Sequence, residues 1–578
     1  MPLRTVSAAL LACLLTAPGM LLHAADGPSP RIVGGNQAPA DFWPWMAQLA
    51  IDDPDVDNGY LLCGASQISP RWVLTAHHCT QYQNDALATA DRMFVYIGET
   101  ERKGTFPQPG RIAVENIYRH QNYNNFSFAH DLALLRIPAT SNNQWPSLAD
   151  DDTFNALNNR SRSQRDEAVT ALGWGQTGSG ELSTRLREVQ LDYIPRTLCS
   201  ELSTLSIPAS TICAAELNPI NGINQDTCFG DSGGPLFIGE EPNPWLVGLT
   251  SFGLENCASG APAGYNHVTT EIAEIERLTT LGGVPLVDMT VTGTNATRYY
   301  QPLNGTQIIS ATLRNNSTRN TATNATVSRT LDGSLTTSAR FDWNGCSTLN
   351  TATRCTVASS LAAGGSRTGS VAVTDSSGTD QVVTLTLSAS ADENDYRRRN
   401  DDRVQEIAFS DNPDLALSAA QQTSSPTRAR LALTLSNRSA LNAATNTGIS
   451  FPLPANTQLV NGAELGCQQG NPVFCPVGDL DTEQSERLIL EFTTDTGISQ
   501  TFTFNASADQ SDLPGDTDTE ADITVQYNAS VNTAAGGSSG GGGTSLWLGL
   551  MVLLLGVRLH NNSRQHFLLL FLQQEKVI

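Results

Sequence analysis

The stretch QDTCFGDSGGP, at residues 225–235, places two carboxylates close to one hydroxyl. The hydroxyl belongs to Ser232, and the carboxylates belong to Asp226 and Asp231. A nearby negative charge makes it harder for a serine to give up its proton, so neither aspartate is suited to activate Ser232 directly. If Ser232 is a nucleophile, each aspartate needs a different role.

Two further motifs precede this stretch. LTAHHC lies at 74–79 and HDLALLRI at 130–137, so His, Asp and Ser motifs follow one another along the chain. In this order, and with GDSGGP at 230–235, the region from 31 to about 283 resembles the trypsin-like serine proteases of the chymotrypsin fold. The resemblance implies a double β-barrel that hydrolyses peptide bonds through an acyl-enzyme, and it implies neither a metal nor a cofactor.

The resemblance also assigns the catalytic roles. His78 is the expected base, because the family places its histidine directly before the cysteine, and Asp131 is expected to orient it from a buried position. Ser232 is the expected nucleophile, and the backbone N–H groups of Gly230 and Ser232 are expected to form the oxyanion hole. Two neighbouring histidines are expected to take no part in catalysis: His77 and His130.

Asp231 matches the family residue that turns inward to meet a new N-terminus. Cleavage of PSPRIVGG between Arg31 and Ile32 would create that terminus and release a propeptide at 26–31. An unpaired buried charge costs several kcal/mol, so pairing of the Ile32 ammonium with Asp231 would order the site. The sequence therefore predicts a zymogen.

Asp226 lies where the family has the floor of its specificity pocket. A carboxylate there selects substrates with Arg or Lys before the scissile bond. Ser251, Phe252 and Gly253 match the strand that forms the pocket wall, with Phe in place of the usual Trp. Ala263 stands in place of a pocket glycine, which leaves the balance between Arg and Lys open.

The chain has eleven cysteines, and Cys13 would leave with a signal peptide. The even number that remains is typical of disulfides in an exported protein. The resemblance and the repeats described below predict these pairs: Cys63–Cys79, Cys199–Cys213, Cys228–Cys257, Cys346–Cys355 and Cys467–Cys475.

Short β-type runs such as MAQLAI, RWVLTA and WLVGLTSF, separated by turn residues, predict an all-β core over 32–283. TTEIAEIERLTTL, near the end of this region, predicts a helix, because Ile272, Ile275 and Leu278 recur at helical spacing.

Beyond residue 285 the composition shifts to Thr, Ser, Asn and Ala, with alternating strands. Two halves resemble each other, and each carries a close pair of cysteines. We therefore expect two Ig-like β-sandwich domains, at 285–400 and 405–530, with linkers near 393–404 and 510–521. A spacer role and a binding role both remain open for them.

The two ends carry targeting signals. Residues 1–25 read as a signal peptide, with Arg4 before an apolar run and small residues at the cleavage site. A Gly/Ser linker at 534–545 precedes an apolar segment at 546–558 and a tail of unknown role at 559–578. These features resemble the GlyGly-CTERM sorting signal of Gram-negative bacteria, with a glycolipid-anchor signal as the alternative.

The net charge of −23 argues against nucleic acid as a partner, because phosphate binding needs a basic surface. The leading interpretation is a secreted or surface-attached endopeptidase acting on proteins and peptides. The alternative is a catalytically silent protease homologue that serves as a surface adhesin or binding protein.

Overall fold

The computed structural model describes residues 35–527 except for short segments. These segments are 56–59, 104–107, 204–205, 220–223, 241–242, 254–256, 333–336, 344–345, 348–352, 496–497 and 515–517. The predicted signal peptide, propeptide, Gly/Ser linker, apolar segment and tail lie outside the described residues, as do Arg31 and Ile32. Among the described residues, every helix is too short or too polar to cross a bilayer.

A six-stranded antiparallel barrel forms the second half of the region expected to be a protease. Its strands are β10 (Val169–Gly173), β11 (Arg187–Ile194), β12 (Thr211–Ala215), β13 (Pro235–Ile238), β14 (Trp245–Phe252) and β15 (Ala263–His267). The barrel closes because β11 pairs with both β10 and β12. Two short strands add to its outside: β1 (Asn36–Gln37) on β11 and β9 (Ser147–Leu148) on β14.

A seven-stranded antiparallel sheet forms the first half. In spatial order its strands are β6 (Ile112–Ala113), β5 (Met93–Ile97), β2 (Met46–Asp52), β3 (Tyr60–Ser69), β4 (Trp72–Thr75), β8 (Ala133–Arg136) and β7 (Asn116–Arg119). The strand order is linear among the described residues, so this half differs from the second closed barrel that the resemblance implies. Apolar side chains on its concave side, such as Leu49, Val73 and Leu135, are fully buried.

Three helices accompany these sheets: α1 (Asp151–Asn158), α2 (Arg196–Leu202) and α3 (Ile272–Leu281). The predicted helix near the end of the region is confirmed as α3. Ile272, Ile275 and Leu278 are buried on one side of it, where they pack against Trp72 and Leu134. Helical spacing thus identified the face that α3 turns toward the sheets.

The next region contains two five-stranded sheets that pack on one core. One sheet runs β17 (Met289–Gly293), β19 (Thr306–Asn315), β24 (Ser366–Asp375), β21 (Thr337–Trp343), β22 (Cys346–Ser347). The other runs β18 (Arg298–Gln301), β27 (Asp402–Phe409), β25 (Gln381–Ser390), β20 (Ala322–Asp332), β23 (Arg354–Leu361). Alternate residues of β25, such as Val383, Leu385 and Leu387, enter the core, as expected for strands with one solvated face.

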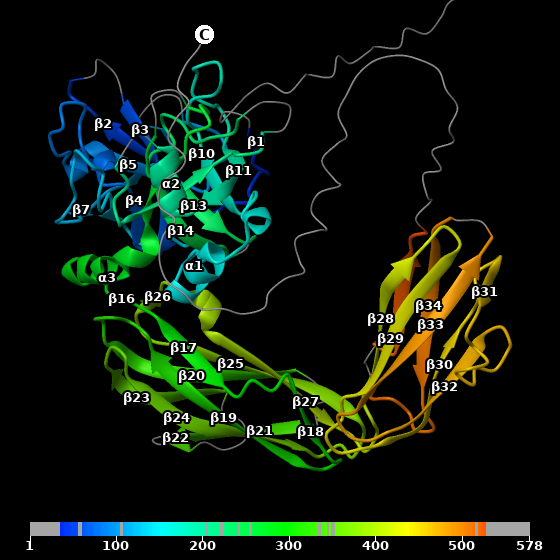
Figure 1. The fold of residues 1–578 in the computed structure, drawn as a ribbon. Helices are drawn as coiled ribbons and strands as arrows, with labels where there is room; N and C mark the ends of the chain where they lie inside the picture. Colours follow the sequence, from blue (N-terminus) through cyan, green and yellow to red (C-terminus); the bar gives the residue numbers. More distant parts are fainter. Residues whose placement is uncertain are drawn as a thin grey trace, which may run out of the picture.

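Two four-stranded sheets form a second sandwich. One contains β28 (Leu415–Ser424), β29 (Arg428–Asn437), β33 (Ser485–Thr494) and β31 (Thr457–Leu459). The other contains β32 (Val473–Leu480), β30 (Ala444–Phe451), β34 (Gln500–Ser507) and β35 (Glu520–Val525). Phe451, Phe492, Phe502 and Phe504 fill the space between them. In Figure 1 this sandwich continues from the end of the first one at β18 and β27, where Arg298 binds the buried carboxylate of Asp414.

The predicted linker at 393–404 is wrong. Residues 394–395 form β26 (Asn394–Asp395), which pairs with β16 (Leu286–Val287), and a 3₁₀ turn at Arg398–Asn400 follows. β27 then begins at Asp402 and pairs with β25, so this strand belongs to the first sandwich and extends past the expected boundary at 400. A polar sequence resembled a linker here because its charged groups are satisfied by partners far away in the chain.

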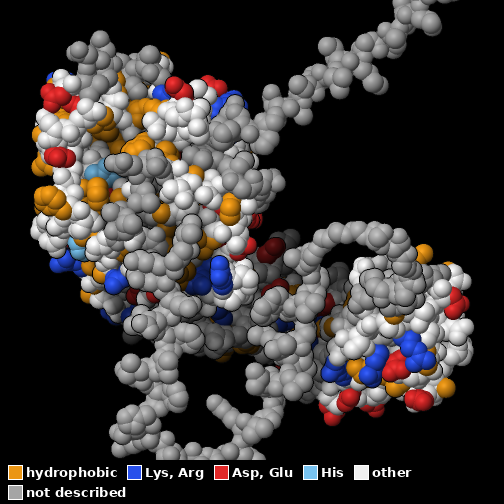
Figure 2. Space-filling model, turned by 45° about the horizontal axis from the view of Figure 1, so that its top comes forward, with side chains coloured by type: hydrophobic (Ala, Val, Ile, Leu, Met, Phe, Trp, Pro, Cys, Tyr) orange, Lys and Arg blue, Asp and Glu red, His pale blue; other side chains and the backbone are white. Residues whose placement is uncertain are grey.

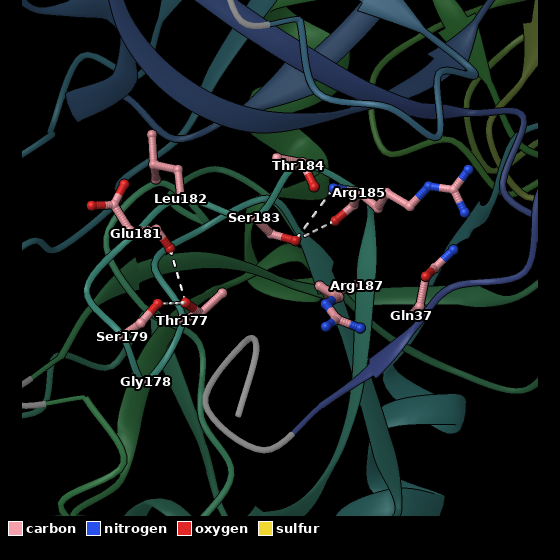
Figure 3. Close-up of a pocket in the computed structure, with 10 residues that line it drawn as sticks. All are labelled: Gln37, Thr177, Gly178, Ser179, Glu181, Leu182, Ser183, Thr184, Arg185 and Arg187. Atoms are coloured by element: carbon pink, nitrogen blue, oxygen red, sulfur yellow. Dashed lines mark hydrogen bonds between the residues drawn. The ribbon is translucent and has the colours of Figure 1, made fainter. Parts of the chain in front are cut away.

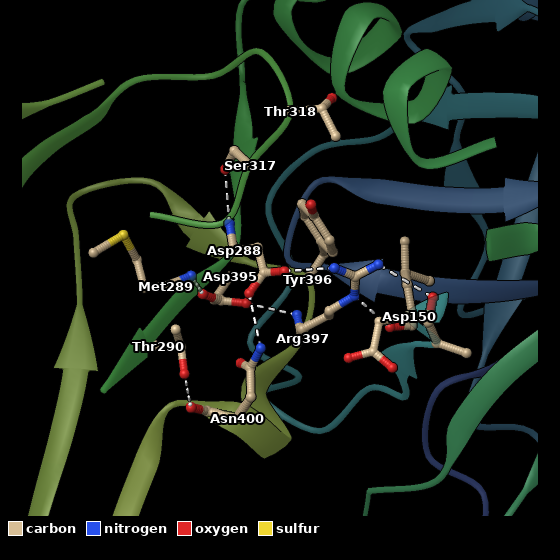
Figure 4. A network of polar contacts seen from close by, with 12 residues as sticks. Asp150, Asp288, Met289, Thr290, Ser317, Thr318, Asp395, Tyr396, Arg397 and Asn400 are labelled. Carbon is tan, nitrogen blue, oxygen red and sulfur yellow. Dashed lines mark hydrogen bonds and ion pairs between the residues drawn. The ribbon is translucent and has the colours of Figure 1, made fainter. Parts of the chain in front are cut away.

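Figure 4 shows Arg397 turned toward Asp288, one of these partners. The Arg397 guanidinium donates to the carbonyl oxygens of Leu148 (3.0 Å) and Ala149 (3.2 Å) and pairs with Asp288 at 2.5 Å. The Tyr396 hydroxyl donates to Glu276 of α3 at 2.7 Å. These bonds fasten the first sandwich to the barrel region at fixed positions.

Candidate active site

Strand pairing brings His78 and Asp131 together. His78 opens a 3₁₀ turn shortly after β4, whereas Asp131 lies just before β8. β4 and β8 are antiparallel neighbours, with Thr75 opposite Ala133, so the end of one strand lies beside the start of the other. Nδ1 of His78 lies 2.7 Å from an Asp131 carboxylate oxygen, and the His78 backbone N–H donates to the other oxygen at 3.0 Å.

Asp131 is fully buried and accepts a third hydrogen bond, from the Ser251 hydroxyl at 2.5 Å. Burial acts to raise the pKa of Asp131. The charge of His78 and the hydrogen bonds from His78 and the Ser251 hydroxyl outweigh this effect, so the pKa of Asp131 lies below its usual value. Burial acts to lower the pKa of His78, but the Asp131 carboxylate more than offsets this and raises it. The pair is therefore an ionised carboxylate that favours a protonated imidazole, which suits a general base.

His77 takes a separate position. Its ring stacks on Tyr123 at 4.0 Å between centroids, and burial lowers its pKa to about 4. This environment therefore keeps the His77 imidazole neutral near neutral pH, and its ring packs on Tyr123.

Ser232 lies in the turn before β13, where two glycines are required. Gly233 has φ +74°, and a Cβ there would lie 2.2 Å from the Thr75 hydroxyl and 2.6 Å from the Gly64 carbonyl oxygen. Gly230 has φ +98°, a conformation that L side chains rarely adopt. The Ser232 carbonyl accepts the Gly64 N–H at 2.7 Å, which holds the turn against β3.

A cavity of about 460 Å³ connects the predicted residues. Its walls include His78, Ser232, Asp226, Ser251, Phe252, Gly253 and Ala263. The structure thus brings the candidate base, the candidate nucleophile and the candidate pocket residues to one hollow. Gly230 and Asp231 lie beside this wall in sequence, and Asp131 lies behind His78.

Asp226 is a buried residue in the wall of this cavity. One carboxylate oxygen accepts the Ala258 N–H at 3.0 Å, whereas Oδ1 is buried and has no hydrogen-bond partner among the described residues. Burial raises the pKa of Asp226 to about 7. A buried carboxylate oxygen without a donor is costly, so this pocket suits a cationic group that supplies one.

The glycines on either side of Ala263 and Phe252 differ in the space around them. A Cβ at Gly253 would meet nothing within 4 Å, whereas a Cβ at Gly264 would lie 2.4 Å from the Phe252 ring. Ala263 is buried in the wall, at 4% exposure. The Cys228–Cys257 disulfide joins two segments of the rim.

Sequence reasoning missed Phe128. Its ring stacks on Phe252 at 5.5 Å between centroids and stands edge-on to His78 at 6.1 Å. The signal that was available is the aromatic-rich loop NYNNFSFAH directly before Asp131. Phe126 of the same loop is 98% exposed. Figure 2 shows several patches of apolar side chains on the surface of the molecule.

Asp231 has an environment of its own. It is fully buried, and its carboxylate accepts the N–H groups of Gly175 at 2.7 Å and Cys228 at 2.9 Å. Burial raises the pKa of Asp231 to about 6. A Cβ at Gly173 or Gly175 would lie 2.0 Å or 2.4 Å from this carboxylate, so both glycines make room for it. Its predicted partner, Ile32, lies outside the described residues.

A second hollow, of about 380 Å³, lies beside the loop from Thr177 to Arg187 and reaches Gln37 of β1 (Figure 3). Its walls are mostly polar loop groups, such as Ser179 and Glu181. None of the predicted catalytic or pocket residues lines it, so it is separate from the candidate site.

Four of the expected disulfides are present in the described residues: Cys63–Cys79, Cys199–Cys213, Cys228–Cys257 and Cys467–Cys475. The predicted Cys346–Cys355 bond depends on a side chain outside the described ones. The first bond anchors the residue after His78 to β3, which limits movement of the base.

Comparison with known proteins agrees with this geometry. Residues 32–274 match the trypsin family. Transmembrane protease serine 11G of Mus musculus is 31% identical over 250 residues, which cover 42% of this chain and 54% of that protein. The Rattus norvegicus protein of the same name is 31% identical over 247 residues, covering 41% and 53%. The chain thus spans about half the length of these relatives, and its residues 32–274 are similar to the trypsin family.

Proposed function

We propose that this protein is a serine endopeptidase that cleaves proteins and peptides after Arg or Lys. One observation carries the proposal: a single cavity is lined by His78, Ser232 and Asp226, and Asp226 Oδ1 is buried without a hydrogen-bond partner among the described residues. An arginine or lysine side chain of suitable length would satisfy that oxygen and place its own carbonyl carbon near Ser232.

The reaction uses the chain's own groups. Nε2 of His78 takes the proton of the Ser232 hydroxyl as the oxygen attacks the carbonyl carbon, and Asp131 stabilises the resulting imidazolium through Nδ1. The backbone N–H groups of Gly230 and Ser232 donate to the oxyanion. The imidazolium then protonates the leaving amine, and water hydrolyses the acyl-enzyme by the same route in reverse.

We propose that the chain is made as a zymogen cleaved between Arg31 and Ile32. The support is the buried Asp231, which has two backbone donors but a charge that burial disfavours. An ammonium group at Ile32 would offset this cost. An Arg31→Gln protein should stay inactive until it is cut by other means, and full activity with Ile32 still blocked would contradict the scheme.

We further propose that the protein acts outside the cell, secreted or attached to the surface through its C-terminus, in a Gram-negative bacterium. The disulfides fit an oxidising compartment, and the two matched relatives are named as transmembrane proteases. The Ig-like sandwiches would then hold the protease away from the surface or bind a ligand there.

A chromogenic arginine ester and a peptide library test the peptidase proposal against the adhesin alternative. Matured wild type should hydrolyse the ester, and Ser232→Ala should lose this activity. Ser251→Ala is unsuitable as a control because Ser251 binds Asp131, so the exposed Ser179→Ala serves instead and should keep activity. Equal hydrolysis by wild type and Ser232→Ala, or none by either, would favour the silent homologue.

A further inference from the structure

The start of α3 holds the loop that carries Asp131. Glu271 directly precedes α3, and its side chain is 2% exposed. His130 Nδ1 lies 2.8 Å from Glu271 Oε1, and His120 Nε2 lies 3.1 Å from Glu271 Oε2. His130 immediately precedes Asp131 in the chain. Glu271 therefore binds the residue next to the carboxylate that supports His78.

Both imidazole rings donate to this glutamate. His120 Nδ1 accepts the Asn122 N–H at 3.0 Å, so the proton of this ring lies on Nε2, toward Glu271. Burial acts to raise the pKa of Glu271, but the hydrogen bonds from His120 and His130 outweigh this effect and lower it. Glu271 is therefore an ionised acceptor, and charge-assisted hydrogen bonds of this kind are strong.

The loop before Asp131 depends on such contacts. Phe128 and His130 adopt φ +55° and +56°, a backbone conformation that residues other than glycine rarely adopt. Residues in such conformations persist only where the surrounding structure holds them. The His130 N–H donates to the Ser210 hydroxyl at 2.9 Å. The His130 carbonyl accepts the Leu132 N–H at 2.9 Å, so a tight turn is centred on Asp131. Release of the His130 ring from α3 would remove one of the bonds that keep this turn in place.

The first sandwich anchors α3 just over one turn beyond Glu271. Glu276 is fully buried, and its carboxylate accepts hydrogen bonds from two backbone N–H groups and two hydroxyls of the sandwich. The N–H donors are Thr318 at 2.9 Å and Arg319 at 2.7 Å. The hydroxyl donors are Thr318 and Tyr396, both at 2.7 Å. These bonds fix the middle of α3 against the sandwich.

A second set of contacts holds the far end of the same helix. The Thr280 hydroxyl donates to Asn320 Oδ1 at 2.6 Å, and the Asn320 amide donates to the Leu286 carbonyl at 2.7 Å. Tyr396, at 1% exposure, belongs to the same buried apolar cluster as Ile275 of α3. In Figure 1 α3 lies between the sheets of the barrel region and the first sandwich. The position of α3 is thus set from both sides.

We propose that the first sandwich positions Asp131 for the peptidase reaction through α3. The sandwich holds Glu276, and Glu271 at the start of the same helix holds His130, so that Asp131 stays beside His78. A packed helix is a rigid element through which two sites can be coupled. Glu271 and Glu276 are positioning residues, because neither is among the described residues that line the cavity. The inference rests on the proposed peptidase function, and it gives the first sandwich a role besides spacing or ligand binding.

Hydrolysis of the arginine ester by matured full-length protein tests the link from α3 to Asp131. Glu271→Gln keeps the size of the side chain but presents an amide to one of the two imidazole donors, so one bond is lost. A displacement of about 1 Å can cost about 100-fold in rate, so kcat should fall about 10–100-fold with KM little changed. Because Asp131 raises the pKa of His78, the pH at which kcat/KM reaches half of its plateau should also move down.

Glu274→Gln is the matched control for this variant. Glu274 also lies on α3 but pairs with Arg277, so its substitution should leave kcat and the pH profile unchanged. Thermal unfolding establishes that each variant is folded at the assay temperature. A merely structural role would lower the melting temperature alone. Folded Glu271→Gln protein with the kcat and pH profile of wild type would therefore overturn the proposal.

The link from the sandwich to α3 needs its own variant. Glu276→Gln should lower kcat and move the pH profile in the same direction as Glu271→Gln, by a smaller factor. Glu393→Gln is the matched control, because Glu393 accepts the N–H and hydroxyl of Thr323 at 2.8 and 2.7 Å within the sandwich. It should keep the kinetics of wild type. Equal kinetics for Glu276→Gln and Glu393→Gln would overturn the role of the sandwich.

Proton NMR of full-length Ser232→Ala protein separates this inference from the peptidase proposal. The proton between His78 Nδ1 and Asp131 gives a downfield resonance that reports on their hydrogen bond without turnover. Glu271→Gln should shift this resonance and lower the pH at which it titrates, and Glu274→Gln should not. If matured wild type fails to hydrolyse the ester, the peptidase proposal fails, whereas this resonance still decides the positioning of Asp131. The same resonance and titration in the parent and in Glu271→Gln would overturn the inference.

Discussion

Replacing Asp226 by asparagine tests the specificity pocket. The change keeps the size of the side chain and removes the charge from a carboxylate whose Oδ1 is buried without a partner. Removing one member of a buried charge pair costs about 2–5 kcal/mol. At about 1.4 kcal/mol per tenfold, kcat/KM for an arginine substrate should fall by a factor on the order of 30 to several thousand.

The assay compares two peptides that differ only in the residue before the scissile bond, which is Arg in one and Leu in the other. Asp226→Asn should lower kcat/KM for the arginine peptide by this factor and leave the leucine peptide within about threefold, because only the former has a charge to lose. Glu181→Gln, a change in the second hollow, is the matched control and should alter neither. An equal loss for both peptides would refute the assignment of Asp226 as the selector.

The pKa of Asp226 adds a test of sign. Because burial raises this pKa to about 7, the empty pocket is largely neutral at pH 6 and charged at pH 8. Binding of benzamidine, whose amidinium resembles an arginine side chain, to the Ser232→Ala protein should therefore tighten as pH rises through 7. Asp226→Asn should remove this dependence, and a pH-independent affinity in the parent would contradict the buried-carboxylate account.

The same burial should oppose folding. The pKa of Asp226 is raised above its unfolded value of 3.8, so the folded chain favours the protonated form, and stability falls as pH rises from about 4 through 7. Asp226→Asn should consequently raise the free energy of unfolding at pH 8 by about a few kcal/mol. Denaturant unfolding at pH 4 and pH 8 measures the difference, which should be small at pH 4.

Three further perturbations separate the remaining groups. Asp131→Asn removes the carboxylate that binds Nδ1 of His78 at 2.7 Å, and kcat for the arginine ester should fall about 10⁴-fold with KM little changed. Asp231→Asn keeps the size of a side chain that accepts two backbone N–H groups. It should lower the activity of the cleaved protein far more than that of the uncleaved protein. If cleavage at Arg31 leaves the activity of the wild type unchanged, this would count against activation by Ile32. Arg397→Ala leaves the Asp288 carboxylate buried without its guanidinium, at a cost of about 3–5 kcal/mol; limited proteolysis should then cut near 394–400, and an unchanged digestion pattern would show that the junction does not depend on this pair.

The His78–Asp131 pair was predictable because the motifs that contain these residues, in their order along the chain, resemble those of the trypsin-like serine proteases. LTAHHC begins within β4 and HDLALLRI contains β8, and the antiparallel pairing of these strands brings His78 to Asp131. The helix α3 was predictable because a single apolar face specified it. The signal for α3 is local, whereas the contact of His78 with Asp131 depends on the pairing of two strands that are distant in sequence.

The features that were missed depend on distant contacts. Phe128 lies in a turn, adopts φ +55° and stacks on Phe252 of β14, a contact that no local pattern reveals. His130 was expected to be a bystander, yet His130 and His120 both pair with Glu271. Glu271 is too distant in the sequence for residue spacing to predict this contact. The segment at 393–404 was expected to be a linker because it is polar, and its charges turned out to be bound by the neighbouring region.

That segment raises a question about self-cleavage, because it contains three consecutive arginines, Arg397, Arg398 and Arg399, in a chain proposed to cut after arginine. A protease of this fold binds substrate as an extended strand, so a susceptible arginine must leave its contacts. Arg398 and Arg399 instead lie over the Trp145 and Trp245 rings, at 4.9 and 5.4 Å. The packing of the first sandwich thus protects Arg397–Arg399 from cleavage. To extend this segment, the cation–π contacts of Arg398 and Arg399 and the bonds of the buried Arg397 must all be broken.

Self-cleavage at this segment therefore reports whether its contacts with the barrel region are intact. Wild type stored after maturation should keep the sandwiches attached, whereas Arg397→Ala should release them by cutting at Arg398 or Arg399, as fragments seen by mass spectrometry. The Arg397→Ala, Ser232→Ala double variant is the control, and it should remain intact because it lacks the proposed nucleophile. Release from the double variant would point to a contaminating protease, and stable Arg397→Ala protein would mean that the contacts at Trp145 and Trp245 suffice to hold the segment.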